Sequence, residues 1–318
     1  RGTPVPQRRL RQEGRWRDEE MKGAFVGGWY FGIDRPLCFV WYRAPMEMKY
    51  IDAHCHIQFE QYKEDDVALI GQMKEQGVAG IVVGVDYESS QKAVALAEKY
   101  EHLYASVGLH PNRVNDERYD ISSHRALAAH SRVVAIGECG LDYFRPTEVN
   151  EEVKEKQKEI LNDQISLAVE LDKPLIIHCR PSSVKATEGK PSYDAYQELV
   201  VILKEAKATY PKLRGDIHFF VGGVEEANAL IALDFALSFT AVITFARDYD
   251  AVICAIPLTS ILTETDAPYV APVSRRGKRN DPLAVIDVAL KIAEIRGEDP
   301  EIVRVTLLAN AKRLFELD

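Results

Sequence analysis

The chain has 318 residues and a net charge of −9, and 46% of its residues are hydrophobic. This length accommodates one large α/β barrel or two smaller domains. The acidic balance argues against a protein that coats nucleic acid electrostatically, and no apolar run is long enough to predict a membrane span. The five cysteines are scattered, are odd in number and form no CxxC pair, which indicates reduced thiols in a cytoplasmic protein.

Residues 1–47 differ from the rest of the chain. They hold nine Lys or Arg and six Asp or Glu, so they carry +3 while the remainder carries −12. They show no regular hydrophobic period and no clear cleavage site of a signal peptide. We therefore expect an atypical extension over 1–47, either disordered or not part of the native protein, with Met46 or Met48 as the candidate start. A single folded domain is expected over 48–318.

From residue 50 onwards, short β-rich runs alternate with amphipathic helical runs. The sequence predicts strands over 50–57, 80–86, 103–111, 133–142, 174–179, 216–222, 236–244 and 261–268. It predicts helices over 65–77, 89–100, 151–172, 192–211, 281–297 and 299–317, with a weaker helical pattern over 246–256. Eight β–α repeats in about 270 residues fit a (β/α)8 TIM barrel, which typically takes ~250 residues. A doubly wound open sheet would place a Gly-rich phosphate loop after its first strand, and this sequence has none there.

The first predicted strand, YIDAHCHI, places Asp52, His54 and His56 at alternate positions. Alternate side chains of a strand project to the same side, so we expect all three on the inner face of the barrel. Such a His pair alone is weak evidence for a metal site, because buried histidines are often hydrogen-bonded core residues. Further ligands from other strands are needed.

Other predicted strands supply these ligands near their C-terminal ends, which converge on one mouth in a barrel. The polar residues at these ends are His110, Glu138, His178, His218 and Asp266. Imidazole and carboxylate groups bind Zn, Mn or Mg, and burying so many polar groups is costly unless they are paired or coordinated. The neighbouring cysteines, Cys55, Cys139 and Cys179, are expected to face the outer helices as small hydrophobic residues.

Four histidines and two carboxylates exceed the needs of one tetrahedral ion, so we predict two divalent ions at the mouth. Glu138 is the best candidate for a bridging ligand, because its strand lies between the two groups of histidines. One ion is assigned to His54, His56 and Asp266, since the first and last strands of a closed barrel are neighbours. The other ion is assigned to His178 and His218 on the adjacent fifth and sixth strands.

Together these residues carry a resemblance to a known family. The segments IDAHCH, GLHP, IGECGLDY, IIHCR, ETDAPYVAP, RGKRNDP and NAKRLFEL resemble the ordered motifs of the TatD family of metal-dependent deoxyribonucleases, from about Lys49 to Leu317. The usual sixth-strand motif HCFSG is here HFFVGG, with Val221 in place of a small polar residue. The segment 180–192 after the fifth strand is longer than we expect.

The resemblance implies a TIM barrel, divalent metal ions, a cytoplasmic location and hydrolysis of DNA phosphodiesters, often as a 3′-to-5′ exonuclease on single strands. By position it implies a contact from His110 to a substrate phosphate and the metal ligands His54, His56, Glu138, His178, His218 and Asp266. DNA is thus the expected partner, with no membrane partner and a monomer favoured.

The expected catalytic residues are Asp266 and Glu138. Two metal ions can clamp the attacking and leaving oxygens of an in-line displacement, and Asp266 can both bind one ion and accept a proton from water. Glu264 either supports this site or is a structural carboxylate of the barrel. The basic loop 274–280 and Arg180 are candidate contacts for the DNA backbone, although charged loops are often merely solvated.

Two other functions fit the same sequence. An amidohydrolase-type enzyme that acts on a small amide, lactone or phosphoester would use the same barrel and ligands. A catalytically silent scaffold is the third hypothesis, but the intact ligand set argues against it.

Overall fold

The computed structural model describes residues 46–144, 149–182 and 194–318. The predicted extension over 1–47 lies almost wholly outside these residues, as does most of the segment 180–192. The described residues 46–318 belong to one compact unit. Met46 and Met48 already pack against the core of this unit, ahead of its first strand.

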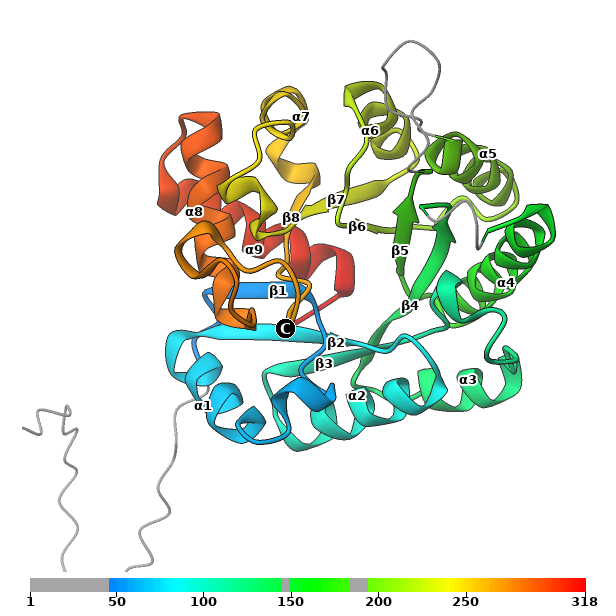
Figure 1. The fold of residues 1–318 in the computed structure, drawn as a ribbon, viewed down its shortest axis with the longest axis horizontal. Helices are drawn as coiled ribbons and strands as arrows, with labels where there is room; N and C mark the ends of the chain where they lie inside the picture. Colours follow the sequence, from blue (N-terminus) through cyan, green and yellow to red (C-terminus); the bar gives the residue numbers. More distant parts are fainter. Residues whose placement is uncertain (1–45, 145–148, 183–193) are drawn as a thin grey trace, which may run out of the picture. The chain divides into compact units, whose positions relative to one another are not determined.

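Eight strands form one sheet in the order β1 to β8, and each neighbouring pair is parallel (Figure 1). This confirms the predicted TIM barrel. The strands are β1 Tyr50–Cys55, β2 Val78–Val83, β3 Leu103–Val107, β4 Val133–Asp142, β5 Leu175–Arg180, β6 Gly215–His218, β7 Phe235–Phe239 and β8 Ile261–Thr263.

The barrel closes between β1 and the segment that follows β8. Asp266 N donates to His54 O at 2.9 Å, and His56 N donates to Ala267 O at 2.8 Å. Asp52 reinforces this closure, because its carboxylate accepts bonds from Thr265 N at 2.8 Å and Thr265 Oγ1 at 2.6 Å. The closure places Asp266 beside the two histidines of the first strand.

The helices lie outside the strands, as Figure 1 shows. They are α1 Asp66–Gln76, α2 Tyr87–Lys99, α3 Ile121–Ala128, α4 Glu151–Glu170, α5 Asp194–Thr209, α6 Val224–Ile231, α7 Asp250–Ala255, α8 Val285–Arg296 and α9 Pro300–Phe315. A continuous apolar layer joins their inner faces to the outward side chains of the strands. Burial of this layer is the main stabilising contribution to the fold. Cys55, Cys139 and Cys179 belong to it, as expected for small hydrophobic residues.

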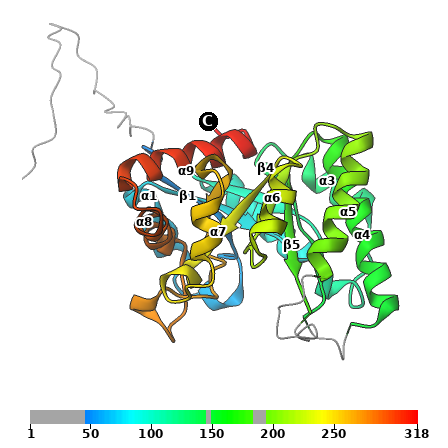
Figure 2. The ribbon, with the colours of Figure 1, turned by 90° about the horizontal axis from the view of Figure 1, so that it is seen from above.

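A second apolar cluster fills the end of the barrel where the strands begin. It joins Ile51, Ile81 and Leu262 of the strands to Ala311 and Phe315 of α9. Helix α9 lies across this end (Figure 2). Its Asn310 fixes the position by donating to Ile261 O at 2.8 Å. The opposite end, where the strands stop, is left open for a site.

Several sequence-based boundaries differ from the structure. The predicted seventh strand over 236–244 ends at Phe239, and Ala241–Thr244 form a 3-10 turn instead. The third strand ends at Val107 and the eighth at Thr263, so His110 and Asp266 lie in the loops just beyond their strands. A register shift between Asp52 and Cys55 interrupts the alternation that we expected across Asp52, His54 and His56. Among the described residues, no helix combines the length and apolarity needed to cross a bilayer.

Candidate metal centre

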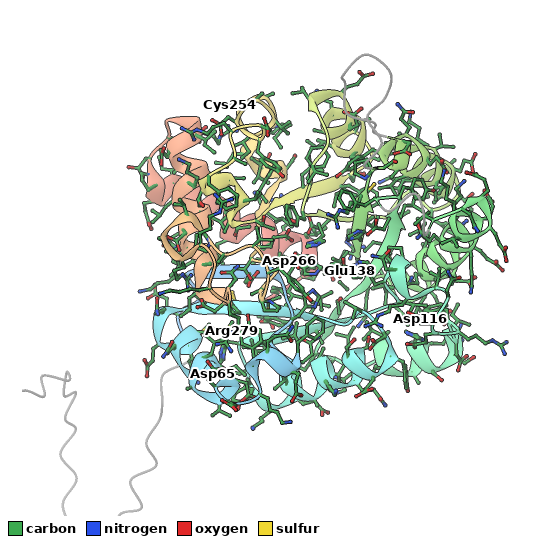
Figure 3. All side chains as sticks on the ribbon, viewed as in Figure 1. Asp65, Asp116, Glu138, Cys254, Asp266 and Arg279 are labelled. Atoms are coloured by element: carbon green, nitrogen blue, oxygen red, sulfur yellow. The ribbon has the colours of Figure 1, made fainter. Side chains whose placement is uncertain are left out.

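The open end of the barrel contains a cavity of about 920 Å³. Six of the seven predicted site residues line it: His56, His110, Glu138, His178, His218 and Asp266. The seventh, His54, is completely buried just beneath. Figure 3 labels both Glu138 and Asp266 near the centre of the barrel. The structure therefore brings all seven residues to one place, although they come from six different strands or the loops that follow them.

Glu138 occupies the centre of this group, and its two oxygens face different histidines. Oε2 lies 3.3 Å from His54 Nε2 and 4.0 Å from His56 Nε2, both on the first-strand side. Oε1 faces three imidazole nitrogens at 2.9, 3.3 and 3.8 Å, which belong to His178, His110 and His218. A carboxylate in this position can offer a ligand atom to either group of histidines.

The nitrogens of the first-strand pair also converge. His54 Nε2 and His56 Nε2 are 3.1 Å apart, and Asp266 Oδ1 lies 3.6 Å from His56 Nε2. His56 is oriented by Val83 O, which lies 2.9 Å from its Nδ1, so its Nε2 is directed toward the centre. Two Nε2 atoms and two carboxylates aimed at one point form a donor set that suits a divalent ion.

Three overlapping triplets of side chains could each hold a metal ion within the described part of the chain. They are His54–His218–Asp266, His54–His56–Glu138 and His110–Glu138–His178, with ligand atoms within 4.8 Å of one another in each triplet. His218 thus also lies close to the two histidines of the first strand. Its ring stacks on that of His54, with the ring centres 3.6 Å apart. The residues fit a metal centre, while the division of ligands between two ions stays a prediction.

Gly140 explains why β4 and β5 can bring Glu138 so close to His178. Its φ of 138° is rarely adopted by residues with a side chain, and an added Cβ would lie 1.9 Å from the carbonyl oxygen of His178. Any larger residue would push the two strands apart. The GECG segment therefore sets the distance between the carboxylate and the imidazole.

Glu264 lies beneath the site and holds one of its histidines. The Glu264 carboxylate accepts bonds from His218 Nδ1 at 3.0 Å, from Phe219 N at 2.7 Å and from Ser238 Oγ at 2.7 Å. Of the two sequence interpretations of Glu264, the supporting role matches this geometry. Hydrogen-bonded carboxylates of this kind fix the ring orientation of metal-binding histidines.

Asp142 is a site residue that the sequence analysis missed. Its Oδ2 lies 3.1 Å from His178 Nε2 and accepts a bond from Asn112 Nδ2 at 2.9 Å. Asp142 lies four positions after Glu138 in the same strand, and side chains at an even spacing in a strand project to the same side. This spacing could have identified Asp142 from the sequence.

The electrostatics of the site keep its carboxylates ionised. Burial alone would raise the pKa of Glu138, but the neighbouring His110 and His54 hold it well below its ordinary value. Burial would lower the pKa of His178, yet Asp142 and Glu138 raise it to about 9. Burial would also lower the pKa of His218, but Glu264 is the main cause that raises it to about 10. Burial, aided by His218, lowers the pKa of His54 to about 4.

Some of the basic side chains that were predicted to contact DNA interact instead with other residues of the protein. Arg279 pairs with Asp65 at 2.5 Å, which Figure 3 shows at the rim of the barrel, and Arg275 pairs with Asp281. Arg276 stacks over Phe245, with its guanidinium carbon 4.5 Å from the ring centre. Lys278 is exposed. Ion pairing leaves Arg275 and Arg279 less available to a DNA backbone than their sequence suggested.

The barrel and its ring of histidines and carboxylates define a TIM-barrel hydrolase that depends on metal ions. The model of the family described as TatD related DNase matches residues 51–316, so the chain belongs to this family. It is an enzyme of the metal-dependent hydrolase class.

Comparisons with known proteins agree with this assignment. The chain is 37% identical to the uncharacterized metal-dependent hydrolase YabD of Bacillus subtilis, over 84% of this chain and 99% of the relative. It is 33% identical to the 3′-5′ ssDNA/RNA exonuclease TatD of Cronobacter sakazakii, over 83% and 97% of the two chains. The crystal structure of the TatD homolog YjjV from Escherichia coli superposes with a TM-score of 0.75 at 29% identity, covering 86% of this chain and all of that one.

Proposed function

We propose that the protein hydrolyses DNA phosphodiester bonds with the help of two divalent ions, as a 3′-to-5′ exonuclease on single strands. The observation that supports this most is the placement of Glu138, whose two carboxylate oxygens face separate groups of imidazoles. Two-ion sites of this kind are typical of enzymes that cleave phosphodiesters. The exonuclease name carried by similar TatD proteins favours nucleic acid as the substrate.

The ligands that would hold the ions are His54, His56, Glu138, His178, His218 and Asp266. Bound divalent ions, whether Mg, Mn or Zn, polarise the phosphate oxygens and make water more acidic near neutral pH. Hydrolysis adds the water oxygen to phosphorus, breaks one P–O ester bond and delivers a proton to the leaving oxygen.

Asp266 is the proposed acceptor of the proton from the attacking water. Burial alone would raise its pKa, but hydrogen bonding by His56 and the charge of His218 lower it, so the carboxylate is ionised at neutral pH. Its backbone φ of 52° is a left-handed conformation, which Asp tolerates better than most residues and which is often found at functional sites. The carboxylate lines the cavity and can reach a water there.

His110 is proposed to contact the substrate phosphate. Its Nδ1 accepts a bond from Asn112 N at 3.0 Å, so the proton resides on Nε2. That Nε2 faces Glu138 Oε1 at 3.3 Å and lines the cavity. A protonated nitrogen donates to a phosphate oxygen but cannot bind a metal ion. This favours substrate contact over metal binding for His110.

The remaining parts of the proposal are a single-stranded substrate, a monomeric state and a cytoplasmic location. A screen with one metal-loaded preparation tests the substrate class. It should include labelled single-stranded DNA, bis-p-nitrophenyl phosphate, a lactone and an N-acyl amide. We expect turnover of DNA to exceed that of the lactone and amide by several orders of magnitude. Preferential turnover of the amide or lactone would favour an amidohydrolase-type function instead.

A further inference from the structure

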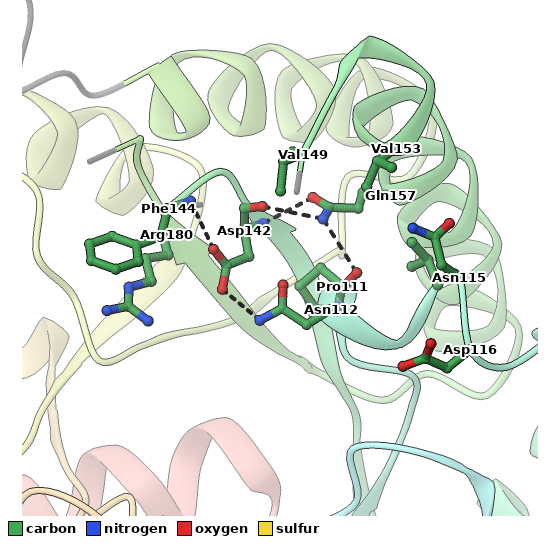
Figure 4. A pocket seen from close by; sticks show the side chains of 11 residues that line it. Pro111, Asn112, Asn115, Asp116, Asp142, Phe144, Val149, Val153, Gln157 and Arg180 are labelled. Atoms are coloured by element: carbon green, nitrogen blue, oxygen red, sulfur yellow. Dashed lines mark hydrogen bonds between the residues drawn. The ribbon is translucent and has the colours of Figure 1, made fainter. Parts of the chain in front are cut away.

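A second, smaller cavity of about 350 Å³ opens beside the candidate metal centre (Figure 4). Four residues line both this side pocket and the main cavity: Asn112, Asp142, Phe144 and Arg180. The two cavities therefore share a wall. This places the side pocket next to the cavity that contains the candidate metal centre.

The shared wall is held by hydrogen bonds that begin at the centre itself. Asp142 Oδ2 contacts His178 Nε2 at 3.1 Å, and its Oδ1 accepts a bond from Phe144 N at 3.0 Å. Gln157 supports the wall from α4 by donating to Asp142 O at 3.2 Å and Pro111 O at 3.3 Å (Figure 4). The pocket is thus already formed and rigidly connected to a proposed metal ligand, which lowers the entropic cost of binding.

Phe144 offers an aromatic surface at the wall that the two cavities share. The guanidinium carbon of Arg180 lies 3.7 Å from the centre of the Phe144 ring, and 37% of Phe144 is exposed. The ring is not needed to complete the apolar core, whose members are buried. An exposed aromatic ring paired with Arg is the usual platform on which proteins stack a nucleobase.

The polar groups of the pocket suit a base. Among the described residues, its lining includes the carboxylates of Asp116 and Asp142 and the cationic group of Arg180, and Arg113 Nη1 lies 4.0 Å from Asp116 Oδ2. The amino groups of a base find an acceptor in Asp116, and Asn115 offers an amide donor, while its Oδ1 accepts from Lys156 Nζ at 3.4 Å. Val149 and Val153 supply an apolar wall. The volume is at the lower end of the ~300–1,000 Å³ range of ligand pockets, which suits one nucleoside rather than an oligonucleotide.

We propose that this side pocket binds the base of the 3′-terminal nucleotide that the enzyme releases, stacked on Phe144. The proposal rests on the proposed exonuclease function and names its terminal subsite. With the 5′-phosphate of that nucleotide at the metal centre, the pocket accommodates one base and no continuing strand. Cleavage would therefore be restricted to the end of a chain.

Calorimetric binding of two probes to the full-length protein with Mn²⁺ tests the pocket directly. The probes are 2′-deoxyadenosine 5′-monophosphate and 2-deoxyribose 5-phosphate, in which a hydroxyl replaces the base. The unaltered protein should bind the nucleotide roughly 5- to 150-fold more tightly, the range expected for one stacked base. In Phe144→Ala the ratio of the two affinities should fall toward one. Phe144→Tyr keeps the ring and should retain the ratio.

Tyr210→Ala is the matched control. Tyr210 is a similarly exposed aromatic residue, at 41%, which follows α5 at the end of the barrel where strands begin. This variant should keep the full ratio. Equal binding of the two probes by the unaltered protein, or a ratio that survives Phe144→Ala, would overturn the proposal.

A parallel assay on single-stranded DNA separates this inference from the proposed function. DNA cleavage together with equal binding of the two probes would refute the side pocket alone. Preferential nucleotide binding that depends on Phe144, without any DNA cleavage, would refute the nuclease function and support the pocket as a nucleotide site.

Discussion

Glu264 Oε2 accepts a hydrogen bond from His218 Nδ1 at 3.0 Å, between two buried side chains that lie 46 positions apart in the sequence. The bond turns the opposite ring nitrogen, Nε2, toward Glu138 Oε1, which is 3.8 Å away. Ser238 and Phe219 N donate to the same carboxylate, so its position is fixed. Glu264 therefore acts through His218 and is a positioning residue.

Replacing Glu264 with Gln should weaken metal binding without removing any proposed ligand. The amide removes the negative charge that holds His218, and loss of such a supporting partner typically costs ~10–100-fold in metal affinity. Titration of the metal-free protein with Mn²⁺ measures the effect. Glu170→Gln is a suitable control, because Glu170 pairs with Arg125 on the outer surface. Equal affinities for the two variants would contradict the positioning role.

The proposed bridging position predicts a larger effect at Glu138. Glu138→Ala should lower the metal content and abolish hydrolysis, while the barrel remains folded because its stability comes mostly from the packed layers below the mouth. Elemental analysis and circular dichroism on one preparation give both quantities. A variant that retains its full complement of metal would rule out the bridging role.

Metal binding should release protons at neutral pH. With pKa values of about 9 and 10, His178 and His218 are protonated at pH 7 in the absence of metal. A metal ion must displace these protons, so its affinity should rise as pH increases toward these values. His54, with a pKa of about 4, is already neutral and releases none. Calorimetry in buffers of different ionisation enthalpy counts the protons, and a count of zero would show that neither imidazole becomes a ligand.

The same pKa values predict how the metal-free protein responds to alkali. Both folded-state values lie above the ~6.5 of an unfolded histidine. Their stabilising contribution is therefore complete below about pH 6.5 and is lost as pH rises through 9 and 10. Denaturant unfolding of the metal-free protein should show a decline in the free energy of unfolding across this window, and a flat profile would contradict the assigned charges.

A chain that begins at Met48 should fold and keep its activity. The barrel begins with β1 at Tyr50, and Met46 is only partly buried against the cluster at the end of the barrel. Burying a complete Met side chain contributes ~1.5–3 kcal/mol, so loss of Met46 should cost about 1 kcal/mol or less. Comparing denaturant midpoints of chains that begin at Met46 and at Met48 measures this term together with that of the exposed Glu47. Failure of the shorter chain to fold would refute the proposed domain boundary.

The barrel could be predicted because strand-like and helix-like hydrophobic periods alternate along the sequence. The site could be predicted because polar residues recur where apolar strands end. Helices α3 and α6 were missed, since each spans only eight residues, which is about two turns. The eighth strand was extended too far because residues 264–268 resemble a strand in composition. In the structure they form the irregular segment that closes the barrel against β1.

Hydrophobic periodicity cannot predict contacts between segments that lie far apart in the sequence. Nothing near His178 in the sequence indicates that Asp142 contacts its ring, because that contact arises from the pairing of β4 with β5. The side pocket likewise combines the loops after β3 and β4 with helix α4 and the end of β5. The ion pair of Arg279 with Asp65 joins residues that lie 214 positions apart. The sequence alone therefore did not show that this arginine of the basic loop is already paired.

Cleavage of single-stranded DNA labelled at its 3′ or 5′ end, in Mg²⁺, Mn²⁺ or Zn²⁺, tests the central claim most directly. Asp266→Asn serves as the matched control, because it keeps the shape of the side chain but removes the charge that accepts the proton. We predict stepwise shortening from the 3′ end that requires metal, and a rate ~10²–10⁴-fold lower in the variant. Affinity for DNA should change less, since His110 is retained. No cleavage with any of the three metals, or cleavage by Asp266→Asn within a few-fold of the unaltered protein, would contradict the account.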